Sequence, residues 1–376
     1  MHCITAEISL GALRENVRLL RERIGPAVKF CAVVKADAYG HGLDLLAGPI
    51  EQVADWLAVC TPEEAVALRR LGVRKPILAL FSPHAVPGER HREEALDTLI
   101  REEVVLTVGQ CPAVDVIRAA TERTQKAVTV HVKIDTGMQR AGVLPDEVPD
   151  LLARLRAEPR IRLGGVCTHF ATADESDRTP LVDQLACFHQ ALSDQPLPSD
   201  LIRHAAASAA VIDLPETHLD MVRVGLALYG CAPAEPIRER VPLRPILRLT
   251  APLMQIKAVR TGTRTGYGLA YTFPSDTSIG LVPIGYGDGY PRCLSNRSMV
   301  SVRGTTVPLR GRVSMDQIVI DLGEVPDAEL GDEVEIISPD PAAPHSAENL
   351  ARLAGTIPYE ILCAVGTTRV QRVPVE

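Results

Sequence analysis

The sequence has no long hydrophobic run and no block of basic residues. None of its apolar stretches reaches the length of a membrane-spanning helix, and residues 1–20 carry scattered charges without the apolar core of a signal peptide. Lysines and arginines are dispersed along the chain, and the formal net charge is −7. We therefore expect no membrane span and no nucleic-acid partner.

The spacing of the cysteines excludes two further classes of protein. The chain has nine cysteines, an odd number, and no two of them form a C-x-x-C pair. Most have apolar neighbours, as Cys31, Cys60 and Cys167 do, and there a thiol packs as a small hydrophobic group. This pattern argues against a disulfide scaffold and against a zinc site, so we expect no bound metal. It also favours the reducing cytoplasm as the location of the protein.

The chain is long enough for two or three domains, or for one barrel and a smaller partner. It has 376 residues, of which 46% are hydrophobic and 23% charged, so a large soluble core is expected. Up to about residue 240, short apolar runs alternate with helix-like stretches such as residues 62–72, which begin near Pro62 and end near Gly72.

Eight apolar runs in this part are candidate strands of a parallel sheet that is covered on both faces. They are FCAVVK (30–35), WLAVC (56–60), PILAL (76–80), VVLTV (104–108), VTVHVKID (128–135), LGGVCTH (163–169), LIRHAA (201–206) and MVRVGLALYG (221–230). Their number predicts an α/β fold with a (β/α)8 barrel over residues 8–240. A doubly wound open sheet fits the periodicity almost as well, although no G-x-G-x-x-G follows the first strand.

The composition changes near residue 240, where prolines cluster at positions 233, 236, 242, 245 and 252. Beyond them come short alternating strands and many glycines, a pattern typical of a mostly β domain, which we place at residues 241–376. Its expected strands lie within residues 247–259, 278–287, 299–309, 317–323 and 332–338.

Residues 30–42, FCAVVKADAYGHG, form the most informative segment of the chain. A small apolar strand runs into Lys35, and Tyr39 and two glycines around His41 follow. A buried strand that delivers a lysine to its C-terminal tip suits an enzyme that holds an aldehyde cofactor as a Schiff base, because desolvation makes the amine a better nucleophile. Taken alone, the segment fits a strand that ends in a solvated lysine equally well.

Residues 32–42, AVVKADAYGHG, resemble the signature of the alanine racemase family, whose enzymes use pyridoxal 5'-phosphate. Further motifs follow in that family's order and cover nearly the whole chain: KIDTGMQRAG (133–142), THFATAD (168–174), HAAASAA (204–210), VRVGLALYG (222–230), GYG (266–268), GYGDG (285–289), GRVSMDQ (311–317) and PYE (358–360). The resemblance implies a TIM-like barrel followed by a mostly β C-terminal domain, with which residues 1–7 also pair.

The resemblance also implies how the cofactor is held. Lys35 matches the residue that carries it. The cofactor's phosphate would be bound by hydroxyls and backbone N–H groups at Tyr39, Ser208, Gly225, Leu226 and Tyr359. Arg223 matches the residue that faces the pyridine nitrogen, and His204 matches the residue that is hydrogen-bonded to this arginine. Because arginine does not lose its proton, it leaves the pyridine nitrogen unprotonated and the ring a weak electron sink, which suits a brief carbanion.

Racemisation requires a proton to leave one face of the substrate and to return on the other, so two bases are expected. Lys35 would serve one face, and Tyr267 matches the family's second base. An ordinary phenol is a poor base at neutral pH, so cationic neighbours are expected around Tyr267, with His169 in the network behind it. In the family this tyrosine comes from the other subunit, which implies a head-to-tail homodimer with shared active sites.

The remaining matches concern the substrate. Arg140 and Met315 match residues that bind its carboxylate, Asp316 would position the loop of Met315, and Tyr286 matches a tyrosine at the entrance of the site. Lys133 matches a lysine that CO₂ carbamylates in many members, and we carry this over as a hypothesis.

The first interpretation is a pyridoxal phosphate-dependent alanine racemase that supplies D-alanine for peptidoglycan. A racemase of serine or of a broader range of amino acids in the same family is the closest alternative. A barrel-fold decarboxylase of basic amino acids is a second one, although those enzymes place an acid where Arg223 stands. A non-enzymatic carrier of the cofactor is a third, although such proteins resemble the barrel alone.

Overall fold

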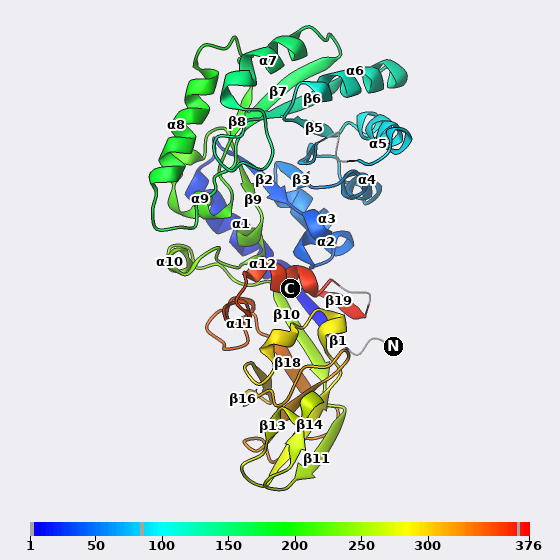
Figure 1. Cartoon of the computed structure of the whole chain (residues 1–376), viewed down its shortest axis with the longest axis vertical. Coiled ribbons are helices and arrows are strands. Elements are labelled where there is room, and N and C mark those ends of the chain that lie inside the picture. Colours follow the sequence, from blue (N-terminus) through cyan, green and yellow to red (C-terminus); the bar gives the residue numbers. More distant parts are fainter. Residues whose placement is uncertain (1–3, 83–85, 367–368) are drawn as a thin grey trace.

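The computed structural model describes residues 4–82, 86–366 and 369–376, so residues 1–3 of the segment expected to pair with the C-terminal domain lie outside the described part. A barrel of strands and helices is followed by a smaller, mostly β region, and the two lie end to end (Figure 1). In the described part of the chain, no helix combines the length and the apolar character that crossing a membrane requires.

The first region is built on an eight-stranded parallel sheet with the order β8-β7-β6-β5-β4-β3-β2-β9. Its two ends meet, because Asp220 N–H donates to Arg203 O at 3.0 Å and Arg223 N–H donates to Ala206 O at 2.9 Å. The predicted barrel is therefore confirmed, and the open sheet is wrong. The strands are β2 (Lys29–Val33), β3 (Trp56–Val59), β4 (Ile77–Ala79), β5 (Val105–Val108), β6 (Val128–Lys133), β7 (Ile161–Cys167), β8 (Ile202–His204) and β9 (Met221–Val224).

Helices cover the outside of the barrel and bury their apolar faces against strands that are themselves almost wholly buried (Figure 1). They are α1 (Leu10–Ile24), α3 (Leu43–Val53), α4 (Pro62–Arg70), α5 (Glu89–Arg101), α6 (Pro112–Thr124), α7 (Val148–Arg156), α8 (Thr179–Ser193) and α9 (Ser208–Asp213). The predicted helix after Thr61 is confirmed, and its start is a capping box in which Thr61 and Glu64 exchange side chain–backbone hydrogen bonds.

At the ends of β2 and β9 the chain turns before the apolar run is complete. β2 ends at Val33, and the short helical turn α2 (Lys35–Tyr39) follows it. β9 ends at Val224, because the chain turns at Gly225 into the 3₁₀-helix η4 (Leu226–Tyr229) instead of continuing as strand to Gly230. Both changes of direction occur at the carboxyl edge of the barrel, where active sites of this fold lie.

The second region contains a six-stranded sheet of order β16-β15-β18-β10-β1-β19, a three-stranded sheet of order β11-β14-β17 and the pair β12-β13. The strands are β1 (Ile4–Ser9), β10 (Leu247–Pro252), β11 (Gln255–Val259), β12 (Arg264–Thr265), β13 (Tyr271–Thr272), β14 (Thr277–Val282), β15 (Met299–Val302), β16 (Thr305–Pro308), β17 (Ile318–Asp321), β18 (Glu333–Ile337) and β19 (Val370–Val375). The helices are α11 (Ala347–Ala354) and α12 (Pro358–Ala364).

Both ends of the described chain lie in the six-stranded sheet. β1 runs antiparallel to β10 and parallel to β19, with Thr5 opposite Thr250 and Ala6 opposite Arg372. The chain leaves this sheet through α1 into the barrel and returns to it at β10. We propose that the two domains divide near residue 240, between the end of β9 at Val224 and the start of β10 at Leu247.

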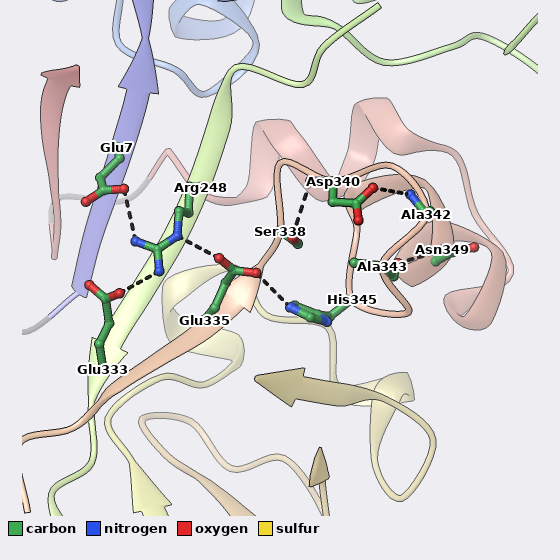
Figure 2. Close-up of polar contacts among 10 residues, drawn as sticks. All are labelled: Glu7, Arg248, Glu333, Glu335, Ser338, Asp340, Ala342, Ala343, His345 and Asn349. Carbon is green, nitrogen blue, oxygen red and sulfur yellow. Dashed lines mark hydrogen bonds and ion pairs between the residues drawn. The ribbon is translucent and has the colours of Figure 1, made fainter. Parts of the chain in front are cut away.

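One arginine ties three strands of this sheet together (Figure 2). Arg248 on β10 donates to Glu7 of β1 at 3.1 Å, to Glu333 at 2.5 Å and to Glu335 at 2.6 Å, both on β18. His345 lies 3.0 Å from the same Glu335 carboxylate. Hydrogen bonds from His345 and Arg248 lower the pKa of Glu335 to about 2, so this carboxylate remains charged over a wide pH range.

Candidate functional site

Lys35 stands at the carboxyl edge of the barrel, at the start of a left-handed turn. Ala36, Asp37, Ala38 and Tyr39 all have φ between 53° and 55°, although none of them is glycine. Each such residue costs on the order of 1–3 kcal/mol, and such strain persists only where the surroundings enforce it. From the barrel side, the carboxylate of Glu64 enforces it by accepting the Ala36 N–H at 2.6 Å.

Arg223 is buried near the carboxyl end of β9, and its hydrogen-bond partners among the described residues are all neutral. Its guanidinium donates to His204 Nδ1 at 2.8 Å, to the carbonyls of Thr168 and Ala205 at 2.9 and 3.0 Å, and to His169 Nδ1 at 3.3 Å. The sequence-predicted contact between His204 and Arg223 is therefore present. No carboxylate among the described residues pairs with this arginine, so its charge is available to a ligand.

The hydrogen bonds of Arg223 fix the tautomers of the histidines beside it. Burial holds the pKa of His204 well below its usual value, so the ring is neutral and carries one proton. Because arginine only donates, His204 Nδ1 accepts, and the proton lies on Nε2. His204 Nε2–H then donates to His131 Nδ1 at 2.8 Å.

His131 ends this chain of hydrogen bonds in the core. Burial, with a smaller contribution from Arg223, lowers the pKa of His131 to about 3. Its Nε2 is buried, without a hydrogen-bond partner among the described residues, and its ring lies 5.4 Å from that of Trp56. The hydrogen bonds are therefore donated in one direction, from Arg223 to His204 and from His204 to His131.

Four cationic side chains converge on His169, which follows β7. Burial lowers the pKa of His169 to about 3, and the positive charges of Arg223, Arg140, Lys133 and Lys35 lower it further. Arg223 lies on β9 and Lys35 in the turn after β2. Lys133 ends β6, and Arg140 lies in the segment that follows it. The structure thus brings them to one place, which becomes strongly attractive to an anion.

The loop after β6 is organised by Asp135. Its buried carboxylate accepts the N–H groups of Gly137, Gln139 and Arg140 at 2.9–3.0 Å. Although burial works in the opposite direction, these bonds lower the pKa of Asp135, and the loop presents Arg140 at the barrel mouth. Burial lowers the pKa of Lys133, and the charges of Arg140 and Arg223 act in the same sense.

Hydroxyl and backbone groups gather around Gly225. Ser208 Oγ accepts the N–H groups of Gly225 and Ala227 at 3.1 and 3.2 Å, which leaves the serine's own proton free to donate. A Cβ at position 225 would lie 2.3 Å from Tyr39 Oη, so glycine is required here for the close approach. The rings of Tyr39 and Tyr359 are 5.8 Å apart, and burial raises the pKa of Tyr359 to about 12 and that of Tyr39 further, so both phenols stay protonated.

Apart from Tyr359, the site residues expected from the C-terminal region lie away from this group and are exposed. Tyr267 is 71% exposed in the 3₁₀-helix η5 (Tyr267–Leu269), next to β13 at the end of the β region away from the barrel (Figure 1). Met315 is 54% exposed and Tyr286 43%. One chain by itself therefore does not bring Tyr267 to Lys35.

The loops of Tyr286 and Met315 hold each other in place. Tyr286 N–H donates to Ser314 O at 3.0 Å, and Gly287 N–H donates to Met315 O at 2.9 Å. Asp316 pairs with Arg369 at 2.5 Å, and Arg369 also pairs with the buried Asp288 at 2.7 Å. Through Arg369, Asp316 is thus connected to Asp288 in the loop of Tyr286.

Two family descriptions match this chain, "Alanine racemase, N-terminal domain" over residues 8–233 and "Alanine racemase, C-terminal domain" over residues 246–374. The alanine racemase of Desulfovibrio desulfuricans is 38% identical over 377 residues, which cover 99% of this chain and 98% of the relative. That of Halothermothrix orenii is 39% identical over 377 residues, with 99% and 96% covered. The chain belongs to the alanine racemase family.

Solved structures of that family have the same fold. The alanine racemase of Clostridium difficile matches with a TM-score of 0.91 at 34% identity, covering 100% of this chain and 96% of that one. The enzyme from the D-cycloserine producing Streptomyces lavendulae matches with a TM-score of 0.92 at 37% identity, covering 100% and 98%. The relatives named alanine racemase are isomerases, so this chain is an enzyme of the isomerase class, and the match of both domains argues against a carrier built from the barrel alone.

Glu64 and His131, which contact the site, are not predicted as site residues from the sequence. Glu64 was interpreted only as part of a helix, and nothing near it in the sequence indicates a contact with the turn of Lys35. His131 carried a usable signal, since it lies two residues before Lys133 on the same strand and therefore on the same face.

Proposed function

We propose that this protein is a pyridoxal phosphate-dependent enzyme that interconverts L-alanine and D-alanine. The observation that carries the proposal is Arg223, a buried cation whose partners among the described residues are all neutral. It offers a fixed proton donor to a ring nitrogen and no carboxylate that would keep that nitrogen protonated. This arrangement favours racemisation over decarboxylation, which benefits from a stronger electron sink.

The residues present fit the cofactor. Four cationic side chains act electrostatically on His169 at the barrel mouth, and this positive charge suits a dianionic phosphate and a phenolic oxygen. The donors suited to the phosphate are the hydroxyls of Ser208, Tyr39 and Tyr359 and the backbone at Gly225 and Leu226. The absence of a Cβ at Gly225 lets the Tyr39 hydroxyl lie against that backbone. Lys35, at the rim of the same barrel, is the residue to which the aldehyde would be attached.

When bound, pyridoxal phosphate supplies an aldehyde that condenses with amines and a ring that makes the α-proton of a linked amino acid removable. Lys35, once released by the incoming amino group, would move a proton at the α-carbon on one face. Arg223 would keep the ring nitrogen unprotonated, and His204 and His169 would hold the guanidinium in place. Arg140 would orient the substrate carboxylate.

The opposite face of the substrate needs a second base, and we assign this role to Tyr267 of the partner subunit. Tyr267 is exposed in its own chain, as expected for a side chain that acts in another. Met315 would contribute a backbone N–H to the substrate carboxylate from the same loop region, and Tyr286 would line the entrance. The enzyme would therefore be a head-to-tail homodimer with shared active sites.

Lys133 is suited to carbamylation. Its lowered pKa increases the fraction of free amine, and a free amine attacks CO₂ with loss of a proton to give a carbamate anion. The anion would pair with Arg140, whose guanidinium has no hydrogen-bond partner within the described residues. A carbonyl signal in ¹³CO₂ NMR that disappears in Lys133→Arg supports the assignment, and its absence from the native enzyme contradicts it.

We place the enzyme in the cytoplasm, where D-alanine would be made as a precursor of peptidoglycan. The test incubates the purified protein and pyridoxal phosphate with L-alanine in D₂O, and follows the α-proton by NMR and the product by chiral chromatography. D-alanine that carries deuterium at the α-carbon is the expected result. Faster turnover of serine than of alanine would move the proposal to a broader racemase, and no exchange with either amino acid would contradict it.

A further inference from the structure

The turn that carries Lys35 needs support from outside the barrel. Within it, Ala38 N–H donates to Val34 O at 3.0 Å, Gly40 N–H to Ala36 O at 2.9 Å and Gly42 N–H to Asp37 O at 3.0 Å. These bonds close a left-handed turn, but they do not select it over the right-handed one that residues other than glycine prefer. Contacts from other elements must therefore make the selection.

Arg372, on the C-terminal strand β19, supplies such contacts at two points of the turn. Its Nη2 lies 2.9 Å from the Asp37 carboxylate, and its Nε donates to Gly40 O at 3.0 Å. The arginine side chain is only 18% exposed. One planar guanidinium therefore joins the beginning of the turn to its end, a geometry that a lysine cannot reproduce.

The carboxylate of Asp37 is bound from two sides. Its Oδ1 accepts the N–H of Leu43, the first residue of α3, at 2.7 Å, while Oδ2 faces Arg372. Asp37 thus connects the turn to the helix that follows. If Arg372 is removed, the carboxylate keeps its bond to Leu43 but loses the partner that fixes its other oxygen.

The C-terminal segment approaches the turn closely at two glycines. A Cβ on Gly42, where φ is +97°, would lie 2.7 Å from Arg372 Cδ, so the aliphatic part of the arginine packs directly on the turn. A Cβ on Gly40 would lie 2.2 Å from Leu362 O of α12. Figure 1 shows α12 and β19 at the junction, next to α2. The C-terminal segment is therefore pressed against the lysine turn.

The backbone of Arg372 is anchored in the β region. Residue 372 pairs with Ala6 in the parallel ladder of β19 and β1. The backbone of Arg372 thus belongs to the six-stranded sheet, while its side chain contacts the turn at the carboxyl edge of the barrel.

From these contacts we propose that Arg372 is a positioning residue: from the C-terminal strand it holds the left-handed turn that presents Lys35. The inference deepens the proposed function, because it concerns the residue assigned to carry the cofactor. Loss of Arg372 lets the backbone that carries Lys35 sample other conformations. Attachment of an aldehyde at Lys35 then becomes weaker and slower.

The test compares Arg372→Gln with Arg248→Gln, since both remove an ion-paired arginine of the six-stranded sheet, and of the two only Arg372 touches the turn. Amide hydrogen exchange is measured by mass spectrometry on the dimer-forming full chain after the cofactor has been removed. We expect the amides of residues 38–43 to exchange about tenfold faster in Arg372→Gln and at the native rate in Arg248→Gln. Pyridoxal phosphate should bind about tenfold more weakly to Arg372→Gln, measured by its absorbance and by borohydride trapping at Lys35.

Two further variants distinguish the loss of the Arg372 contacts from a general loss of structure. Arg372→Lys should restore part of the protection, and Asp37→Asn should reproduce the faster exchange, because it removes the charge and keeps the side-chain oxygen that Leu43 needs. Unchanged exchange in both Arg372→Gln and Asp37→Asn would overturn the inference, as would equal loosening in Arg248→Gln. No measurement involves alanine, so a protein that fails to racemise alanine contradicts the proposed function and leaves this test intact.

Discussion

The two regions of the molecule contribute to the site in opposite ways. The barrel residues are buried and bonded within their own chain: Arg223 is 6% exposed and His204 0%. The β-region residues that we assign to the site of the partner are on the surface, with Tyr267 71% exposed and Met315 54% exposed. The barrel residues, together with Tyr359 and Arg372 from the β region, form one half of the site within a single chain, which we call the barrel half. The exposed residues form the other half, and we propose that they act in the partner subunit. Damage to the barrel half should impair cofactor binding, and damage to the exposed half should impair turnover alone.

Lys35→Ala should cause the largest effect, because it removes both the point of attachment and one base. We expect activity to fall by roughly 10⁴-fold or more and trapping of the cofactor by borohydride to disappear. The matched control is Lys29→Ala, which alters an exposed lysine at the other end of the same strand, β2. Covalent trapping that persists in Lys35→Ala would show that another lysine carries the cofactor.

Tyr267→Phe should leave the barrel half intact. We expect turnover to fall by about 10²–10⁴-fold, while the affinity for pyridoxal phosphate and its trapping at Lys35 stay native. In D₂O one alanine enantiomer should still exchange its α-proton, because the lysine base remains. Tyr271→Phe, which removes a hydroxyl from the adjacent strand β13, is the control and should be active. Equal loss of exchange with both enantiomers would contradict the division of roles.

These regions also differ in how far their structure follows from sequence. The eight barrel strands were predictable, because apolar runs separated by amphipathic helices fit few folds other than a parallel sheet. Once the strands are placed, the polar residues at their carboxyl ends are placed as well. The left-handed turn at residues 36–39 was not predictable, because the sequence ADAY contains no glycine and its conformation depends on Glu64 and Arg372, which are distant in the chain. The helical turn after Gly225 was missed for a similar reason, since Ser208 accepts its N–H groups from another element.

A substitution of His131 tests a residue that contacts His204 and is not itself assigned to the cofactor. His131→Phe takes away the acceptor of His204 Nε2–H and leaves a buried donor unpaired, at a cost of about 1–3 kcal/mol in unfolding free energy. Because His204 is then free to turn, we expect activity to fall by about tenfold and the absorbance of the bound cofactor to change. His131→Asn, whose amide oxygen can accept the same proton, should recover much of both properties. A fully active His131→Phe enzyme would separate this histidine from the function of Arg223.

The smallest effect is expected in the β region at Glu335. Its pKa is lowered from 4.5 to about 2 in the folded protein by hydrogen bonds from His345 and Arg248, so its pairing contributes stability above pH 4.5 and loses that contribution as the pH falls toward 2. Glu335→Gln should therefore be less stable than the native protein at neutral pH, and the difference should shrink in acid. Thermal unfolding across this pH range measures it, with cofactor affinity at neutral pH unchanged. A difference that is independent of pH would rule out the electrostatic origin.

The central claim is that the barrel of one chain and the β region of another build each active site, and mixing two inactive variants tests it most directly. Lys35→Ala and Tyr267→Phe chains are unfolded together, refolded as an equal mixture and assayed for racemisation. In mixed dimers one of the two sites regains both Lys35 and Tyr267, so the account predicts recovery to about a quarter of native activity from variants that are each inactive alone. If the mixture stays as inactive as its components although mixed dimers are present, both residues act within one chain, and the shared site is contradicted.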